Sequence, residues 1–191
     1  NHIRKNFFKD TIDLFDKSTQ EKIEAYDASI GLDENIVATV KKYLKDYNRY
    51  LEAHKQDKVY LSYYQILALY FTEVYFFHKN TVDFDLFSKN ALAYWMATGS
   101  GKTMIMHINI FQFIAHNKGF KDLELIITTP GVNLIQQHER EVTPLVAYLN
   151  KIHRNKIRFT IDTTSALLNK PDGFFNFPDD KKRQRLILVD E

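Results

Sequence analysis

The sequence predicts an α/β protein in which a parallel β-sheet is flanked by helices, with an α-helical extension at the N-terminus. Three observations predict this fold class. Up to about residue 90, apolar residues recur at the spacing of amphipathic helices. Beyond it, short apolar runs alternate with amphipathic helical segments, which is typical of a parallel sheet. A glycine-rich turn near residue 100 joins one of these apolar runs to a helical segment.

The N-terminal part is expected to be helical. Its apolar stripes fall in three segments, residues 7–15, 36–51 and 62–77. Ser18 is a plausible N-cap, and Glu21 three residues later completes a capping-box pattern. Asp33 is a plausible N-cap for the second segment. We therefore expect helices packed through aromatic-rich faces before the sheet begins.

The C-terminal part is expected to alternate strands with helices. Four apolar runs predict strands, at residues 91–96, 123–128, 157–161 and 186–189. Helices are predicted between them, over 102–116 and 132–141, and the segment 169–184 is predicted to be a loop. A separate helix is predicted after Thr143-Pro144, because Thr is a natural N-cap and Pro a natural first helical residue.

Composition excludes several classes of protein. The 191 residues contain no cysteine, which excludes disulfide scaffolds, zinc-thiolate sites and cysteine nucleophiles and fits a reducing, cytoplasmic location. The longest apolar stretch, residues 66–77, is interrupted by Thr72 and Glu73 and is shorter than the ~20 residues of a membrane span. No membrane association is expected. The net charge of +2 gives no argument for nucleic-acid binding.

The seven histidines, His138 among them, show no spacing typical of a zinc site, so they are interpreted as solvated or core residues. The first residue is Asn rather than Met, and we expect that the chain has been trimmed there.

The glycine-rich turn, residues 94–103, is the segment with the clearest chemistry. Gly99 and Gly101 allow the backbone to turn tightly and bring its N–H groups against phosphate oxygens. Lys102 can reach the β- and γ-phosphates, and the Thr103 hydroxyl can bind Mg²⁺. The general eight-residue pattern would place its first glycine at Met96. The alternative interpretation is a plain glycine turn before a helix, and the flanking strand and helix patterns make it the weaker one.

The last residues form a second element. An apolar strand that ends in Asp190-Glu191 has the form of a strand whose Asp holds Mg²⁺ and whose Glu positions the attacking water. Parallel sheets bind ligands at the carboxyl ends of their strands, where the glycine turn and Asp190 are both expected. Together they predict the core of a Mg²⁺-dependent nucleoside triphosphatase.

Three segments resemble motifs I, Ia and II of superfamily-two helicases and translocases. They are Met-Ala-Thr-Gly-Ser-Gly-Lys-Thr at 96–103, Ile-Ile-Thr-Thr-Pro-Gly-Val-Asn-Leu-Ile-Gln-Gln-His at 126–138 and Leu-Ile-Leu-Val-Asp-Glu at 186–191. With Met96 in place of the first glycine, the loop looks like that of the branch that contains the motor subunits of type I and type III restriction enzymes and their DEAD/DEAH relatives. The resemblance implies that residues 59–191 form the first RecA-like lobe of a P-loop NTPase, after a helical extension over 1–58.

The resemblance also implies roles for individual residues. The phosphates of ATP and the Mg²⁺ ion would be held by Gly99, Ser100, Gly101, Lys102 and Thr103, with Asp190 on the metal and Glu191 on the water. Thr129, Pro130 and Gly131 would contact the sugar-phosphate backbone of one nucleic-acid strand, and Thr163–Ser165 align loosely with motif Ib. Gln65 looks like the glutamine that recognises adenine, and a plain polar helix residue is an equal alternative.

The implied function is that of the ATP-binding lobe of a helicase or translocase that acts on DNA, with RNA as the alternative, in the motor of a restriction-type enzyme. Its expected partners are a second RecA-like lobe of the full-length chain and restriction-modification subunits. The sequence ends at Glu191 within motif II, so we expect these 191 residues alone to turn over ATP negligibly. Two alternatives stay open: a helicase-like nucleotide-binding scaffold, and another P-loop NTPase such as a switch or kinase.

Overall fold

A computed structural model describes residues 21, 22, 25, 31–78, 91–97, 99–153, 156–171, 174 and 182–190. The chain forms two compact units, residues 1–112 and residues 113–191, and the boundary falls within one helix. Among the described residues, no helix is both long and apolar enough to cross a membrane. The helix predicted over residues 7–15 and the predicted Ser18 cap lie outside the described residues, whereas residues 21, 22 and 25 are helical.

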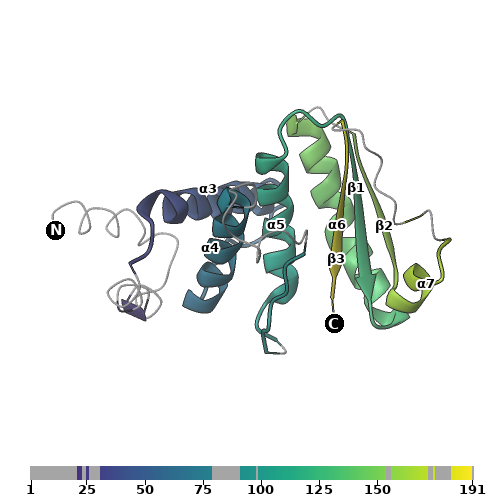
Figure 1. Cartoon of the computed structure of the whole chain (residues 1–191), viewed down its shortest axis with the longest axis horizontal. Coiled ribbons are helices and arrows are strands. Elements are labelled where there is room, and N and C mark those ends of the chain that lie inside the picture. Colours follow the sequence, from purple (N-terminus) through teal and green to yellow (C-terminus); the bar gives the residue numbers. More distant parts are fainter. Residues whose placement is uncertain are drawn as a thin grey trace. The chain divides into compact units, whose positions relative to one another are not determined.

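The first unit contains helices α3 (Glu34–Ala53) and α4 (Tyr63–His78) and most of α5 (Lys102–His116), and α3 lies across α4 (Figure 1). The predicted cap of α3 is confirmed, because Asp33 Oδ1 accepts hydrogen bonds from the N–H groups of Asn35 and Ile36 at 2.8 and 3.2 Å. The backbone N–H of Asp33 donates to the Tyr70 hydroxyl at 3.0 Å. The start of α3 is thus fixed to α4.

A buried polar network ties the three helices of the first unit together. Gln112 on α5 donates from Nε2 to the carbonyl of Leu69 and to Glu73 Oε2, both at 3.0 Å. The Tyr43 hydroxyl on α3 donates to the other oxygen of Glu73 at 3.5 Å. Burial, and then the Glu73 carboxylate, raise the pKa of Tyr43 well above its ordinary value. The network gives the Glu73 carboxyl, which has no exposed surface, partners on two other helices.

One predicted strand is wrong. Residues 91–96, which the sequence predicts as the strand before the glycine turn, have no regular secondary structure. A strand is stable only where a neighbour completes its backbone hydrogen bonds, and no described strand pairs with this segment. Tyr94 holds the segment instead, because its hydroxyl contacts Thr72 Oγ1 on α4 and accepts from Asn109 Nδ2 on α5 at 3.1 Å.

The second unit is built on a three-stranded parallel sheet, which confirms the predicted α/β fold class (Figure 1). The strands are β1 (Asp122–Thr129), β2 (Lys156–Thr163) and β3 (Arg183–Val189), in the order β2-β1-β3. They confirm three of the four predicted strands. The register pairs Thr129 with Thr163 and Thr128 with Val189, so the carboxyl ends of all three strands lie at one edge.

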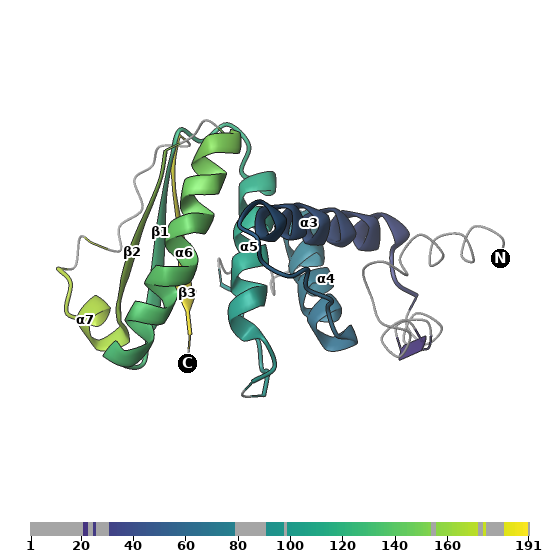
Figure 2. The same cartoon turned by 180° about the vertical axis from the view of Figure 1, so that it is seen from behind.

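Helix α6 (Val132–His153) covers one face of this sheet, as Figure 2 shows from behind. The sequence predicts a break at Thr143-Pro144, but α6 is continuous and contains Pro144. Its buried residues form one stripe on both sides of the proline: His138, Val142, Leu145, Val146 and Leu149. Packing this stripe on the sheet outweighs the ~3 kcal/mol that an interior proline costs a helix.

Candidate functional site

The glycine turn has the backbone geometry of a tight loop that leads directly into a helix. Gly99 and Gly101 have φ of +76° and +81°, a region in which a side chain is strained. The N–H of Ser100 donates to the carbonyl of Ala97 at 3.1 Å, and α5 begins at Lys102. The first backbone hydrogen bond of α5 runs from Ile105 N–H to the Gly101 carbonyl, so the helix itself uses none of the amides before Ile105.

Gln65 connects this loop to α4. Its Oε1 accepts from the N–H of Ser62 at 2.8 Å, which makes Ser62 and Gln65 one half of a capping box at the start of α4. Its Nε2 donates to the carbonyl of Ser100 at 2.7 Å, and the residue is 6% exposed. The structure therefore brings Gln65 and the loop together, with both ends of the side-chain amide already bound to backbone.

The loop has the features that a nucleotide phosphate needs. Backbone amides at the start of α5 and the positive end of its dipole favour an anion at this point. Lys102 and Thr103 occupy the first two helical positions and are both partly exposed. Ser100 Oγ is buried with no hydrogen-bond partner in the described part of the chain, an unusual state for a hydroxyl in a packed loop. The residues present thus fit a triphosphate.

A cavity of about 690 Å³ lies beside the loop within the first unit. Its walls come from α4, from residues 92–97 and from the loop residues Gly99 and Ser100. The walls include large exposed side chains: Tyr64, Phe71, Leu92 and Trp95. The volume and the aromatic lining suit a planar heterocycle.

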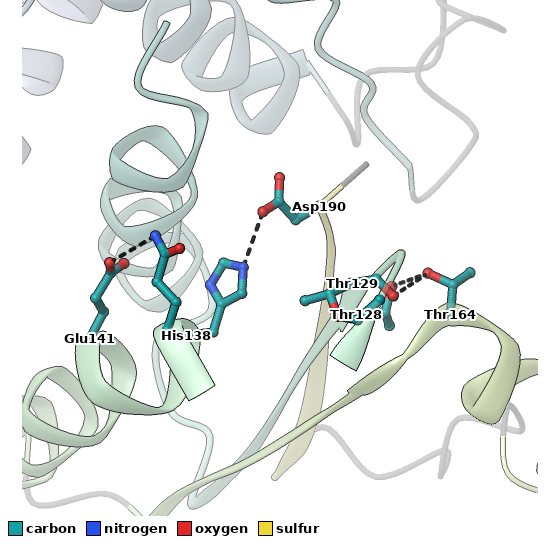
Figure 3. Close-up of polar contacts among 8 residues, drawn as sticks. Thr128, Thr129, His138, Glu141, Thr164 and Asp190 are labelled. Atoms are coloured by element: carbon teal, nitrogen blue, oxygen red, sulfur yellow. Dashed lines mark hydrogen bonds and ion pairs between the residues drawn. The ribbon is translucent and has the colours of Figure 1, made fainter. Parts of the chain in front are cut away.

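Asp190 lies in the second unit, directly after β3, and is held at two points. Its backbone N–H donates to the carbonyl of Thr128 on β1 at 2.9 Å. Its Oδ2 lies 3.0 Å from Nε2 of His138 on α6, which Figure 3 shows. The Asp190 side chain remains 15% exposed. Glu191, the predicted water-orienting residue, lies outside the described residues.

Sequence reasoning missed His138, because it interprets all seven histidines as solvated or core residues. The ring is buried, but it contacts the predicted Mg²⁺ ligand. A signal was present in the sequence: His138 is the polar member of the stripe that continues with Val142, Leu145 and Leu149. A polar residue there, two turns into the helix that follows β1, lies near the carboxyl edge of the sheet.

The turn from β1 into α6 carries the residues predicted to contact nucleic acid. Thr129 is buried, and its hydroxyl donates to the carbonyl of Gly131 at 2.9 Å, while Pro130 is exposed. Thr164 Oγ1 lies 3.2 Å from Thr128 Oγ1 and donates to the Thr129 carbonyl at 3.3 Å (Figure 3). Thr164 begins the short helix α7 (Thr164–Leu168). The segment after β2, which aligns loosely with motif Ib, is therefore connected by hydrogen bonds to the turn after β1.

Among the described residues, no group of three or more His, Cys, Asp or Glu side chains could hold a metal ion. Mg²⁺ does not need such a group, because it is usually bound through one or two carboxylates together with substrate phosphates. The first unit offers the partly exposed hydroxyl of Thr103, and the second unit offers the partly exposed carboxylate of Asp190. Each is an oxygen donor, the type of ligand that Mg²⁺ prefers.

Comparison with known proteins identifies a family model that matches this chain. The family model described as DEAD/DEAH box helicase matches residues 80–190, more than half of the chain. No curated protein and no solved structure matches the chain. The matched residues contain the glycine loop, the β1–α6 turn and Asp190.

Proposed function

Because this chain belongs to the DEAD/DEAH box helicase family, we propose that its glycine loop binds Mg-ATP and that hydrolysis moves a nucleic-acid strand. The observation that carries this proposal is the loop itself. Two glycines with positive φ stand directly before a helix whose first two residues are Lys102 and Thr103. This is the arrangement with which backbone amides and one lysine hold a triphosphate.

Each loop residue has a distinct task in this proposal. The amides that follow Ser100 bind phosphate oxygens, and the Lys102 ammonium neutralises charge on the β- and γ-phosphates. The Thr103 hydroxyl and the Asp190 carboxylate would hold Mg²⁺, and Glu191 would orient the attacking water. Bound Mg²⁺ would supply positive charge that offsets the negative charge of the phosphates. The aromatic cavity beside the loop has room for the base.

The nucleic-acid strand is proposed to lie on the turn after β1. Pro130 and Gly131 are at least partly exposed there, whereas the buried Thr129 shapes the turn through its hydrogen bond to Gly131. Thr163 and Ser165 flank the same edge from β2 and α7. Backbone amides and hydroxyls of this kind contact phosphate and sugar without reading sequence. DNA is the proposed strand, and RNA is the alternative. The two are distinguished by which of them stimulates the ATPase.

We further propose that this chain belongs to a motor of the restriction-enzyme type. It rests on Met96, which stands where the general loop pattern has its first glycine, and on the resemblance of that substitution to this branch. In this proposal residues 59–191 belong to the first RecA-like lobe, and residues 1–58 form an extension that packs on it through α3. A second lobe and restriction-modification subunits would complete the motor.

The test is the ATPase rate of the full-length protein with no nucleic acid and with single- or double-stranded DNA or RNA. We expect stimulation by DNA and a loss of at least tenfold in Lys102→Ala, since Lys102 carries the charge on the phosphates. Lys118→Ala removes an exposed lysine outside the loop and should behave as wild type. Tight ATP binding without turnover would favour the scaffold, and equal rates with and without nucleic acid would contradict the motor.

A further inference from the structure

The buried ring of His138 has no task in the proposed function. It lies on α6 with 1% of its surface exposed. In the described part of the chain its one hydrogen bond runs between Nε2 and Asp190 Oδ2, 3.0 Å apart (Figure 3). The other ring nitrogen, Nδ1, is buried without a partner among the described residues.

The direction of this hydrogen bond follows from the chemistry of its partners. An ionised carboxylate only accepts hydrogen bonds, so the proton lies on Nε2 of the imidazole and is donated to Asp190. The ring is thereby fixed in the tautomer with its proton on Nε2. A hydrogen bond to a carboxylate is among the stronger kinds, so it holds Oδ2 in one direction.

Packing alone does not explain a histidine at this position. The neighbours along the same buried stripe, Val142, Leu145 and Leu149, are apolar. An apolar side chain at position 138 would continue the stripe without burying an unpaired nitrogen, which carries a desolvation cost. The imidazole is therefore better explained by its contact with Asp190 than by the stability of the sheet.

Asp190 needs a fixed direction for the role proposed for it. Its backbone is held by Thr128, and one carboxylate oxygen is held by His138. The second oxygen makes no hydrogen bond within the described residues, and Figure 3 shows it turned away from the ring. One oxygen is thus anchored and the other is open to a ligand.

We propose that His138 is a positioning residue for Asp190: it fixes Oδ2, so that the other oxygen is directed at Mg²⁺. This inference rests on the proposed function. Residues that orient a metal ligand typically change metal affinity or activity 10- to 100-fold when they are removed. The contact also joins α6, the helix that follows the proposed strand-binding turn, to the proposed metal ligand.

The test measures how binding of a fluorescent ATP analogue to the full chain depends on Mg²⁺ concentration. In His138→Leu we expect the Mg²⁺ concentration for half-maximal binding to rise about tenfold or more, with Mg²⁺-free binding unchanged. His138→Gln, whose amide can donate from a similar place, should stay within about threefold of wild type. Val142→Ala, one turn further along the same buried stripe, controls for lost packing and should keep the wild-type Mg²⁺ dependence.

The outcomes separate this inference from the proposed function. If wild type and Lys102→Ala bind the analogue equally, the proposed nucleotide site is wrong. If Lys102→Ala loses binding but His138→Leu keeps the wild-type Mg²⁺ dependence, only the role of His138 is wrong. Should His138→Leu fail to fold, nitrogen-15 NMR of the wild-type histidines decides instead. A proton on Nε2 of His138, with a shift when Mg-ATP is added, supports the proposal, and a neutral ring with its proton on Nδ1 overturns it.

Discussion

The side-chain amide of Gln65 occupies the space that any side chain at Gly101 would need. A Cβ built on Gly101 would lie 2.5 Å from Gln65 Nε2, far inside the normal contact distance. That nitrogen cannot move away freely, because it donates to the Ser100 carbonyl at 2.7 Å. The close approach of loop and glutamine therefore requires glycine at position 101 for two reasons, its φ of +81° and the contact with Gln65.

We predict that Gly101→Ala reduces ATP affinity by at least tenfold. The substitution places alanine in left-handed backbone, at a cost of about 1–2 kcal/mol, and it also displaces Gln65 from Ser100. Isothermal titration calorimetry with ATP measures the effect. Gly119→Ala is the matched control, because Gly119 has φ of +97° with no atom within 4 Å of an added Cβ. The control should lose stability but keep ATP affinity, and equal losses of affinity in both variants would contradict the prediction.

We predict that Gln65→Ala weakens the binding of ATP and GTP by the same factor. Both ends of the Gln65 amide are bound to the backbone of Ser62 and Ser100, so its removal loosens the loop that holds the phosphates rather than the site of the base. The loss of one buried hydrogen bond, about 1–1.5 kcal/mol, corresponds to roughly five- to tenfold in affinity. Competition between the two nucleotides measures the ratio. A loss confined to ATP would instead assign adenine recognition to Gln65.

We predict that Pro144→Ala raises the free energy of unfolding by about 1–3 kcal/mol. Proline removes a backbone N–H and crowds the carbonyl four residues earlier, that of Arg140, within a helix that is otherwise continuous. Alanine restores that hydrogen bond, and the gain is reduced by about 0.4–1 kcal/mol because the unfolded chain becomes less restricted. Urea unfolding measures the change. The neighbouring exposed variant Thr143→Ala should be close to neutral, and an unchanged or lower stability of Pro144→Ala would show that the proline is accommodated without cost.

We predict that stability falls as the pH rises above about 10, the ordinary pKa of a tyrosine. Burial raises the pKa of Tyr43, with a further contribution from Glu73, and burial also raises the pKa of Tyr75 and Tyr94. A pKa raised by folding means that the unfolded chain loses its phenolic protons first. The stabilisation is therefore complete below pH 10 and is lost as the pH rises toward the pKa of the folded state.

Urea unfolding at a series of pH values between 8 and 11.5 measures this loss. Tyr43→Phe removes one of the raised groups and should show a shallower fall above pH 10 than the wild-type chain. Tyr60→Phe is the control, since Tyr60 is more than half exposed. Parallel curves for wild type and Tyr43→Phe would mean that Tyr43 does not contribute to the alkaline loss.

The sequence predicts local elements well where one short-range rule decides them. The Asp33 cap follows from a side chain that reaches amides two and three residues away, and strands β1 and β2 follow from short apolar runs. The loop is recognisable because two glycines, a lysine and a threonine must be adjacent for their chemistry. Prediction was wrong at Pro144 and at residues 91–96. In both places partners distant in sequence decide the outcome: the sheet beneath α6, and the missing neighbour of an expected strand.

The sequence by itself determined the family, the fold class and the residues of the glycine loop, because these depend on patterns that are contiguous along the chain. Only the tertiary structure decided what those residues touch. Gln65 is 35 positions from Ser100, and His138 is 52 positions from Asp190. A hydrogen bond between such pairs exists only after helices and strands have packed, and its direction depends on distances of a few ångströms that no residue pattern encodes.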